Sequence, residues 1–184
     1  SLFIYIDGIR KKASSSKVKA VQNLSRDINF RQAYLKTLRL YEQSHHHPKL
    51  DELKKIIKEK LGKKPDIKII IFNQYRENAK EVVQQLSQME NVNCRLFVGQ
   101  AKKSGTGLSQ KKQKEILDLF REHKFNVICM TSVGEEGLDI PKVDLVIFYE
   151  PIPSTIRHIQ RRGRTGRLQE GEVIILLTQN TRDE

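Results

Sequence analysis

The sequence has no tryptophan, only two cysteines, and no apolar run of the ~20 residues that a membrane-spanning helix needs. Nor does a basic segment followed by an apolar one open the chain, so we expect neither a membrane protein nor a visible secretory precursor. Two cysteines exclude a disulfide-stapled scaffold for 184 residues. Cys94 and Cys129 each lie in a strand-like run, where we expect reduced thiols inside the core.

Acidic residues are scarce in the first third of the chain. The whole sequence carries a net charge of +12, from 34 lysines and arginines against 22 aspartates and glutamates. Residues 1–64 account for +10 of this excess, with 16 basic and 6 acidic side chains. A basic arm on a nearly neutral body indicates a polyanionic partner, with nucleic acid as the first candidate. A solvated, lysine-rich helical surface is the alternative.

The first segment is expected to be helical. Apolar residues recur at helical spacing across residues 2–41, and serines at 14–16 offer N-caps for a second helix as Asp27 does for a third. Short helices do not bury their apolar faces alone, so we expect a larger helical unit whose remainder lies upstream. Histidines at 45–47 are interpreted as a polar linker, because adjacent histidines cannot all face one metal ion. The predicted domains are a basic helical segment at 1–47 and an α/β domain at 48–184.

From residue 48 onwards the pattern is that of an α/β domain. An amphipathic helix across residues 50–61 is expected to stop at Gly62 and Pro65. Five short apolar runs follow, with helix-like stretches between them. The runs cover residues 67–72, 92–98, 127–131, 145–149 and 173–178, and the helical stretches cover roughly residues 74–89, 109–122 and 154–161. This alternation predicts a parallel sheet of five or more strands with helices on both faces. In such sheets, ligands gather at the carboxyl ends of the strands.

Two segments carry the residues best suited to chemistry: the loop after the third predicted strand, and the end of the helix that follows the fourth. The loop at residues 131–141 offers glycines for close backbone approach, and Asp139, which can accept a hydrogen bond from a sugar hydroxyl. Residues 160–167 form the string QRRGRTGR, in which Arg164 and Arg167 lie three apart and can converge on one phosphate. Guanidinium groups placed in this way suit an arginine finger, which meets the negative charge that develops in phosphoryl transfer.

These two segments resemble motifs V and VI of superfamily 2 helicases. The match to motif V lies in Gly137-Leu138-Asp139, and the match to motif VI lies in the Gln-Arg-x-Gly-Arg-x-x-Arg pattern at residues 160–167. Further segments resemble motif IV or narrow the match to the archaeal Hef helicase-nucleases and their eukaryotic FANCM relatives: residues 70–79, 97–101, 107–113 and 135–141. The similarity covers residues 48–184. Residues 1–43 more loosely resemble the end of the helical insertion between that family's two motor domains.

The resemblance implies the second RecA-like motor domain of an ATP-dependent DNA helicase or translocase. Such a domain acts on forked or branched DNA in replication-fork processing and DNA repair. By the family pattern Gln160, Arg164 and Arg167 face the ATP phosphates, the two arginines as catalytic residues. Gly137 and Asp139 contact the nucleotide, and no metal ligand is expected in this chain. The residues that lie toward the DNA backbone are Arg76, Gly99, Gln100, Ser109, Gln110, Thr131 and Ser132.

A further absence limits what the chain does alone. The 184 residues contain no Gly-x-x-x-x-Gly-Lys-Ser/Thr loop, and no Asp-Glu-Ala-His-like segment to bind the metal and activate water. The resemblance therefore implies that ATP and Mg²⁺ are held mainly by an N-terminal RecA-like domain of the same protein, and that residues 1–184 alone hydrolyse no ATP. An XPF-type nuclease domain after residue 184 and a sliding clamp stay open as further partners. The lineage decides between a nucleoid-associated cytoplasmic location in an archaeon and a nuclear one in a eukaryote.

Alternatives stay open for the function and for one residue. A double-stranded RNA-sensing or Dicer-type helicase shares the style of motif V, and a non-catalytic nucleic-acid-binding module on a RecA-like scaffold is a rival of another class. The intact Gln160, Arg164 and Arg167 argue against the second rival. Arg76 has the alternative of pairing with Glu77 or Glu81 along its own predicted helix.

Overall fold

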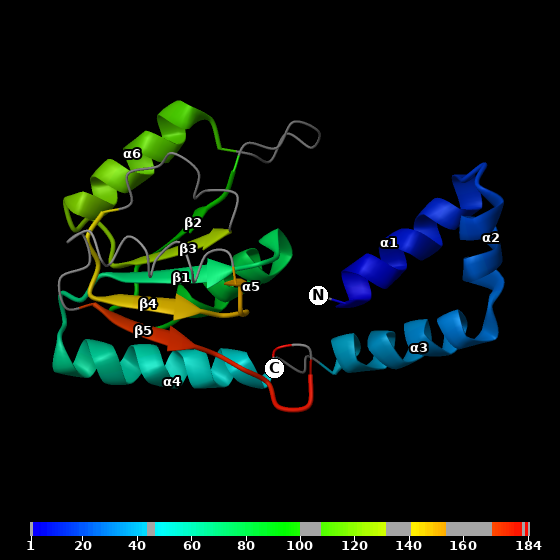
Figure 1. Cartoon of the computed structure of the whole chain (residues 1–184), viewed down its shortest axis with the longest axis horizontal. Helices are drawn as coiled ribbons and strands as arrows, with labels where there is room; N and C mark the ends of the chain where they lie inside the picture. Colours follow the sequence, from blue (N-terminus) through cyan, green and yellow to red (C-terminus); the bar gives the residue numbers. More distant parts are fainter. Residues whose placement is uncertain are drawn as a thin grey trace. The chain divides into compact units, whose positions relative to one another are not determined.

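The structure is a computed structural model that describes residues 2–43, 47–99, 108–131, 141–153, 171–181 and 183 (Figure 1). Its backbone divides into two compact units, Ser1–His47 and Pro48–Glu184. The described part of the first unit is helical, and the second unit holds one sheet with helices against it. The predicted α/β class with a helical N-terminal arm is therefore confirmed.

The helices of the first unit are α1 (Leu2–Ser15), α2 (Lys19–Arg26) and α3 (Ile28–Glu42). As predicted, Asp27 caps α3, because its Oδ1 accepts hydrogen bonds from Asn29 N at 2.8 Å and Phe30 N at 3.1 Å. The serine caps predicted for the second helix are wrong. α1 runs on to its end at the second of these serines, and the N-cap of α2 is Val18, which has no side-chain acceptor. The Ser16 hydroxyl accepts from Val18 N instead, inside the connection.

Little of the apolar surface of this first unit is buried. Among its described side chains, the only buried apolar ones are Ile6 and Ala13 of α1. Phe3 stacks on Tyr41 with ring centroids 4.5 Å apart, and Arg10 lies over the Tyr34 ring at 4.8 Å. The large hydrophobic side chains left exposed in the described part of this unit are Tyr5, Val18, Leu24, Ile28, Leu35, Leu40 and Tyr41. These helices therefore bury little of their apolar surface against one another. This agrees with the expectation that short helices do not bury their apolar faces alone.

The second unit is built on a five-stranded parallel sheet. The strands are β1 (Ile69–Asn73), β2 (Cys94–Phe97), β3 (Val127–Thr131), β4 (Leu145–Phe148) and β5 (Glu172–Ile175), in the spatial order β2-β3-β1-β4-β5. All five predicted apolar runs thus overlap a strand, although β1 ends one residue later than its run, and β5 begins one residue earlier than its run and ends sooner. The helix predicted at residues 154–161 lies outside the described residues.

Helices cover both faces of this sheet (Figure 1). α4 (Pro48–Lys63) and α5 (Arg76–Leu86) pack on one face, where Ile69 and Ile71 of β1 point. α6 (Gln110–Arg121) packs on the other face with Ile70 and Phe72 of the same strand. Alternate side chains of a strand point to opposite faces, so a strand covered on both sides has an unbroken apolar sequence.

The first helix of this unit corrects one prediction. Gly62 does not end α4, which continues to Lys63. A Cβ added at Gly62 would meet no atom within 4 Å, so the glycine serves no close approach there. The helix stops because Pro65 disfavours helical backbone at the residue before it, Lys64.

Candidate nucleic-acid interface

The carboxyl ends of the parallel strands meet at one edge of the sheet, and three of the predicted DNA-contacting residues lie there. Thr131 ends β3 and pairs in register with Asn73, which ends β1. Arg76 begins α5 just after β1, and Gly99 follows the end of β2 by two residues. The fold therefore gathers residues that are 23 to 55 positions apart in the sequence. Thr131 is only 6% exposed, so its side chain packs inside this edge.

Two side chains hold the segment that follows β2. Arg76 Nη2 donates to the Gly99 carbonyl oxygen at 3.3 Å, and Gln113 Nε2 donates to the Val98 carbonyl oxygen at 3.0 Å. Gln113 is buried on the same face of α6 as Leu117 and Phe120. This role of Gln113 was not predicted from the sequence. A lone amide at an apolar position of a helical stripe was the available signal, because a buried amide needs a partner.

The beginning of α6 carries two more of the predicted residues. Ser109 is the N-cap of α6, and its Oγ accepts from Lys112 N at 3.3 Å. Gln110, Lys111 and Lys112 follow it and are exposed. The first turn of α6 contains no acidic residue. A helix N-terminus with lysines and no carboxylate presents a positive end, which favours an anion such as a phosphate.

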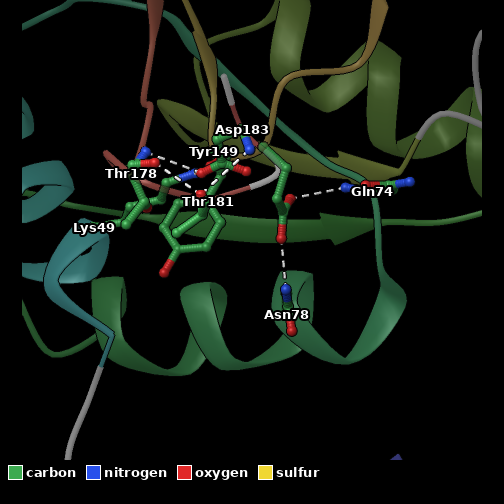
Figure 2. Close-up of polar contacts among 8 residues, drawn as sticks. Lys49, Gln74, Asn78, Tyr149, Thr178, Thr181 and Asp183 are labelled. Atoms are coloured by element: carbon green, nitrogen blue, oxygen red, sulfur yellow. Dashed lines mark hydrogen bonds and ion pairs between the residues drawn. The ribbon is translucent and has the colours of Figure 1, made fainter. Parts of the chain in front are cut away.

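A half-buried carboxylate that was not predicted from the sequence lies at the same edge. Glu150 follows β4, and its Oε2 accepts from Gln74 N at 2.9 Å while its Oε1 accepts from Asn78 Nδ2 at 2.5 Å. Figure 2 labels Gln74 and Asn78, and the dashed lines that end on them mark these two hydrogen bonds. Burial raises the pKa of Glu150 above its ordinary value, although the bonds from Asn78 and Gln74 N and the charge of Lys49 oppose the shift.

A second polar group joins the start of α4 to the end of the described chain (Figure 2). Lys49 is 8% exposed, forms an ion pair with Asp183 and donates to the Tyr149 carbonyl oxygen at 3.0 Å. Asp183 also accepts from Thr178 N at 3.0 Å. A buried lysine is costly without partners, so this network fastens the tail after β5 to α4. The ion pair of Lys49 and Asp183 could not be predicted from the sequence, because neither local pattern indicates that the two residues meet.

Acid is expected to weaken this tail contact. Burial alone would raise the pKa of Asp183, but the hydrogen bonds from Lys49 and Thr178 lower it more, and its pKa lies below the ordinary value. A carboxyl with a lowered folded-state pKa contributes stability above its unfolded pKa of about 3.9, and that contribution is lost as the pH falls through the folded pKa. We expect the free energy of unfolding to fall as the pH drops below about 5 and on through the lowered pKa of Asp183, and Asp183→Asn to flatten this fall.

Urea denaturation at a series of pH values measures this dependence. Lys49→Met removes the cation. It is expected to flatten the fall of the free energy of unfolding at low pH in the same way, which separates the ion pair from other effects of acid. If the free energy of unfolding falls equally at low pH in the wild type and in Asp183→Asn, Asp183 is not the source of this pH dependence.

The first unit presents a basic surface. Its nine lysines and arginines are all exposed: Arg10, Lys11, Lys12, Lys17, Lys19, Arg26, Arg31, Lys36 and Arg39. Residues 1–47 contain three acidic side chains, which leaves a net charge of +6. Asp7 accepts from Lys11 at 2.7 Å and from Arg10 at 3.2 Å, and the bond from Lys11 is the main reason that the pKa of Asp7 is lowered. Exposed positive charge of this kind suits a phosphate backbone.

Seven of the predicted site residues lie outside the described part of the chain. They are Gln100, Ser132, Gly137, Asp139, Gln160, Arg164 and Arg167. In the ranges that the structure does describe, no three His, Cys, Asp or Glu side chains are grouped as metal ligands. Every helix in those ranges is too short or too polar to cross a membrane. Cys94 and Cys129 are buried free thiols with sulfur atoms 3.7 Å apart, as expected of reduced core cysteines.

A parallel sheet covered on both faces, with polar and basic groups at its carboxyl edge, places the domain in the doubly wound α/β class, whose members bind ligands at that edge. Residues 48–169 match the helicase conserved C-terminal domain, and the chain belongs to this family. The predicted resemblance to the Hef helicases and their relatives is also confirmed.

One solved structure and two curated relatives illustrate the similarity. The Hef helicase domain of Pyrococcus furiosus is 47% identical with a TM-score of 0.76, over 99% of this chain and 36% of that one. A protein of Methanocaldococcus jannaschii, whose name proposes an ATP-dependent RNA helicase, is 41% identical over 94% of this chain and 22% of its own length. The ATP-dependent DNA helicase fml1 of Schizosaccharomyces pombe is 42% identical over 72% of this chain and 16% of its own length. The chain thus spans less than a quarter of these curated relatives.

Proposed function

We propose that the chain is the second motor domain of an ATP-dependent DNA helicase or translocase that acts on forked or branched DNA in replication-fork processing and repair. The observation that carries the proposal is the Arg76–Gly99 contact at the carboxyl edge of the sheet. It joins two of the predicted DNA-contacting residues at the place where parallel sheets bind ligands. Family membership and the names of the DNA helicase relatives support the same function.

The DNA backbone lies along this edge in the proposed function. Arg76, Gly99 and Gln100 contact it from the ends of β1 and β2, and Ser132 does so from the end of β3. The predicted contact of Thr131 is left to its backbone, because its side chain is only 6% exposed. Ser109 and Gln110 add the positive end of α6. Contacts of this kind read phosphate and sugar rather than bases, so the motor domain binds DNA of any sequence.

The nucleotide lies between this domain and an N-terminal RecA-like domain of the same protein. That partner domain holds most of the ATP and its Mg²⁺, and Gln160, Arg164 and Arg167 of this chain face the phosphates across the cleft. Gly137 and Asp139 contact the nucleotide. Closure of the cleft brings the arginines to the γ-phosphate and shifts the DNA-contacting loops, which couples hydrolysis to movement. Residues 1–184 alone lack a phosphate loop and hydrolyse no ATP.

The basic helical unit contributes the preference for branches in this proposal. Its exposed lysines and arginines neutralise phosphates beyond those that the motor domain reaches. A nuclease domain after residue 184 and a sliding clamp stay proposals of the same kind, and the lineage decides between cytoplasmic and nuclear location.

Removal of residues 1–43 is expected to weaken fork binding by about tenfold or more, because several phosphate contacts are lost together. Gel-shift titrations of fork, four-way junction and linear duplex DNA measure the effect, with linear duplex affected least. The matched control keeps the helices and replaces Arg31, Lys36 and Arg39 of α3 with glutamine. It should reproduce part of the loss and lower the salt dependence. Equal affinity for forks with and without residues 1–43 would contradict a DNA-binding role for the unit.

An RNA helicase is the second candidate, and the name of the Methanocaldococcus jannaschii relative favours it. A non-catalytic nucleic-acid-binding module is disfavoured by the intact Gln160, Arg164 and Arg167, since a pure binder has no need of phosphate-facing arginines. Nucleic-acid-stimulated ATP hydrolysis distinguishes all three.

A further inference from the structure

Glu150 connects the turn that carries Arg76 to the end of the neighbouring strand. It lies two residues beyond β4, while Gln74 lies in the turn after β1 and Asn78 lies in the first turn of α5. Both oxygens of the carboxylate are used, one by the backbone of the turn and one by the helix. One side chain thus fixes the turn and the helix that begins at Arg76 to a separate segment of the chain.

The strands below this contact are held rigidly. β1 and β4 are neighbours in register, and the Phe72 and Phe148 rings stack with centroids 5.2 Å apart. Both rings are buried, so the two strand ends cannot separate without exposing them. On the other side, Arg76 donates to the carbonyl of Gly99. The segment from Gln74 to Asn78, which we call the Arg76 turn, is therefore held by two contacts. Glu150 connects it to the end of β4, and Arg76 connects it to the segment after β2.

We propose that Glu150 is a positioning residue for DNA binding, which holds the Arg76 turn in the orientation that contacts the DNA backbone. The inference rests on the proposed function, because it assumes that Arg76 contacts phosphate. A carboxylate suits the position because two donors face it and it only accepts. The positioning role also predicts a change in DNA affinity opposite to the change expected from charge alone. Loss of a negative charge near DNA strengthens binding on charge alone, whereas loss of Glu150 as a positioning residue weakens it.

The test is fluorescence anisotropy of the full-length protein with a labelled DNA fork at several salt concentrations. Arg76→Ala is expected to weaken binding about tenfold and to reduce the salt slope by about 1. Glu150→Ala is expected to do nearly the same, and the double variant to bind no more weakly than Arg76→Ala alone. Glu150→Gln keeps an acceptor for Gln74 N and donates to a turned Asn78 amide, so it should stay within about twofold of the wild type. Glu77→Ala, which removes a neighbouring exposed carboxylate, should not weaken binding.

The outcomes separate the two claims. No effect of Arg76→Ala contradicts the proposed DNA contact, whatever Glu150 does. A tenfold loss with Arg76→Ala but none with Glu150→Ala overturns the positioning role alone, as does a full additional loss in the double variant. If Glu150→Ala does not fold, Asn78→Asp replaces it, because two carboxylates then face each other. Glu150→Gln in that background should restore binding, while Glu77→Gln, with the same charge change, should not. Equal rescue by both overturns the inference.

Discussion

Replacement of Arg164 by alanine in the full-length protein is expected to reduce ATP hydrolysis by about 10³- to 10⁵-fold, the range known for arginine fingers in phosphoryl transfer. In the function proposed above, the guanidinium group stabilises charge that develops only in the transition state, so we expect its loss to reduce turnover far more than nucleotide or DNA binding. Fork binding is expected to stay within about twofold of the wild type, because a single arginine at the nucleotide contributes little to DNA affinity. Steady-state hydrolysis and fork titration of the same preparation measure both quantities.

The control for this prediction lies in the same short segment. Arg162 occupies a position to which the helicase pattern assigns no phosphate contact, so Arg162→Ala should keep most of the hydrolysis. It carries the same change in charge and differs from Arg164→Ala only in position. If fork binding in Arg164→Ala falls as much as turnover, the assignment of Arg164 to the ATP phosphates is wrong.

Replacement of Phe148 by alanine is expected to lower the free energy of unfolding by about 3–5 kcal/mol. Phe148 is fully buried in β4 and stacks on Phe72 of β1, on the face of the sheet that α6 covers. Truncation removes the apolar surface of the ring and leaves a cavity between two central strands, which can relax only in part. Urea denaturation followed by circular dichroism measures the change.

Leu177 gives the matched control for this substitution. Its side chain is 55% exposed, so Leu177→Ala is expected to change the free energy of unfolding by less than about 1 kcal/mol. A loss of less than about 1 kcal/mol in Phe148→Ala would contradict the packing described here. Since Glu150 follows Phe148 by two residues, the same packing also supports the proposed DNA-binding edge.

The strands were predictable because their signal is local. β1 shows it best, since Ile69, Ile70, Ile71 and Phe72 all pack in a core and alternate between its two faces. A run without polar residues is typical of a strand covered on both sides. The spatial order of the strands was not predicted, because pairing between segments far apart in the chain depends on the whole fold. The two wrong helix boundaries, at the serines before α2 and at Gly62, are also local. They arise because serine and glycine occur both within helices and at their ends.

The candidate site also contains residues that were predicted from the sequence and residues that only the structure identifies. Arg76 and Gly99 were assigned by resemblance to a known motif, and the structure adds that their groups meet. Glu150 and Gln113 were missed because each acts through a hydrogen bond to a segment distant in sequence. A single carboxylate or amide in a sequence carries no record of its partner. Contacts of this kind become visible only when the sheet brings the loops together.

The central claim is that this domain belongs to a motor driven by ATP and stimulated by branched DNA. The most direct measurement is ATP hydrolysis by the full-length protein in the presence of forked DNA, duplex RNA or no nucleic acid, at one salt concentration. We predict low hydrolysis without nucleic acid, stimulation of about tenfold or more by the fork, and little stimulation by duplex RNA. Equal or greater stimulation by duplex RNA, or none by the fork, would contradict it.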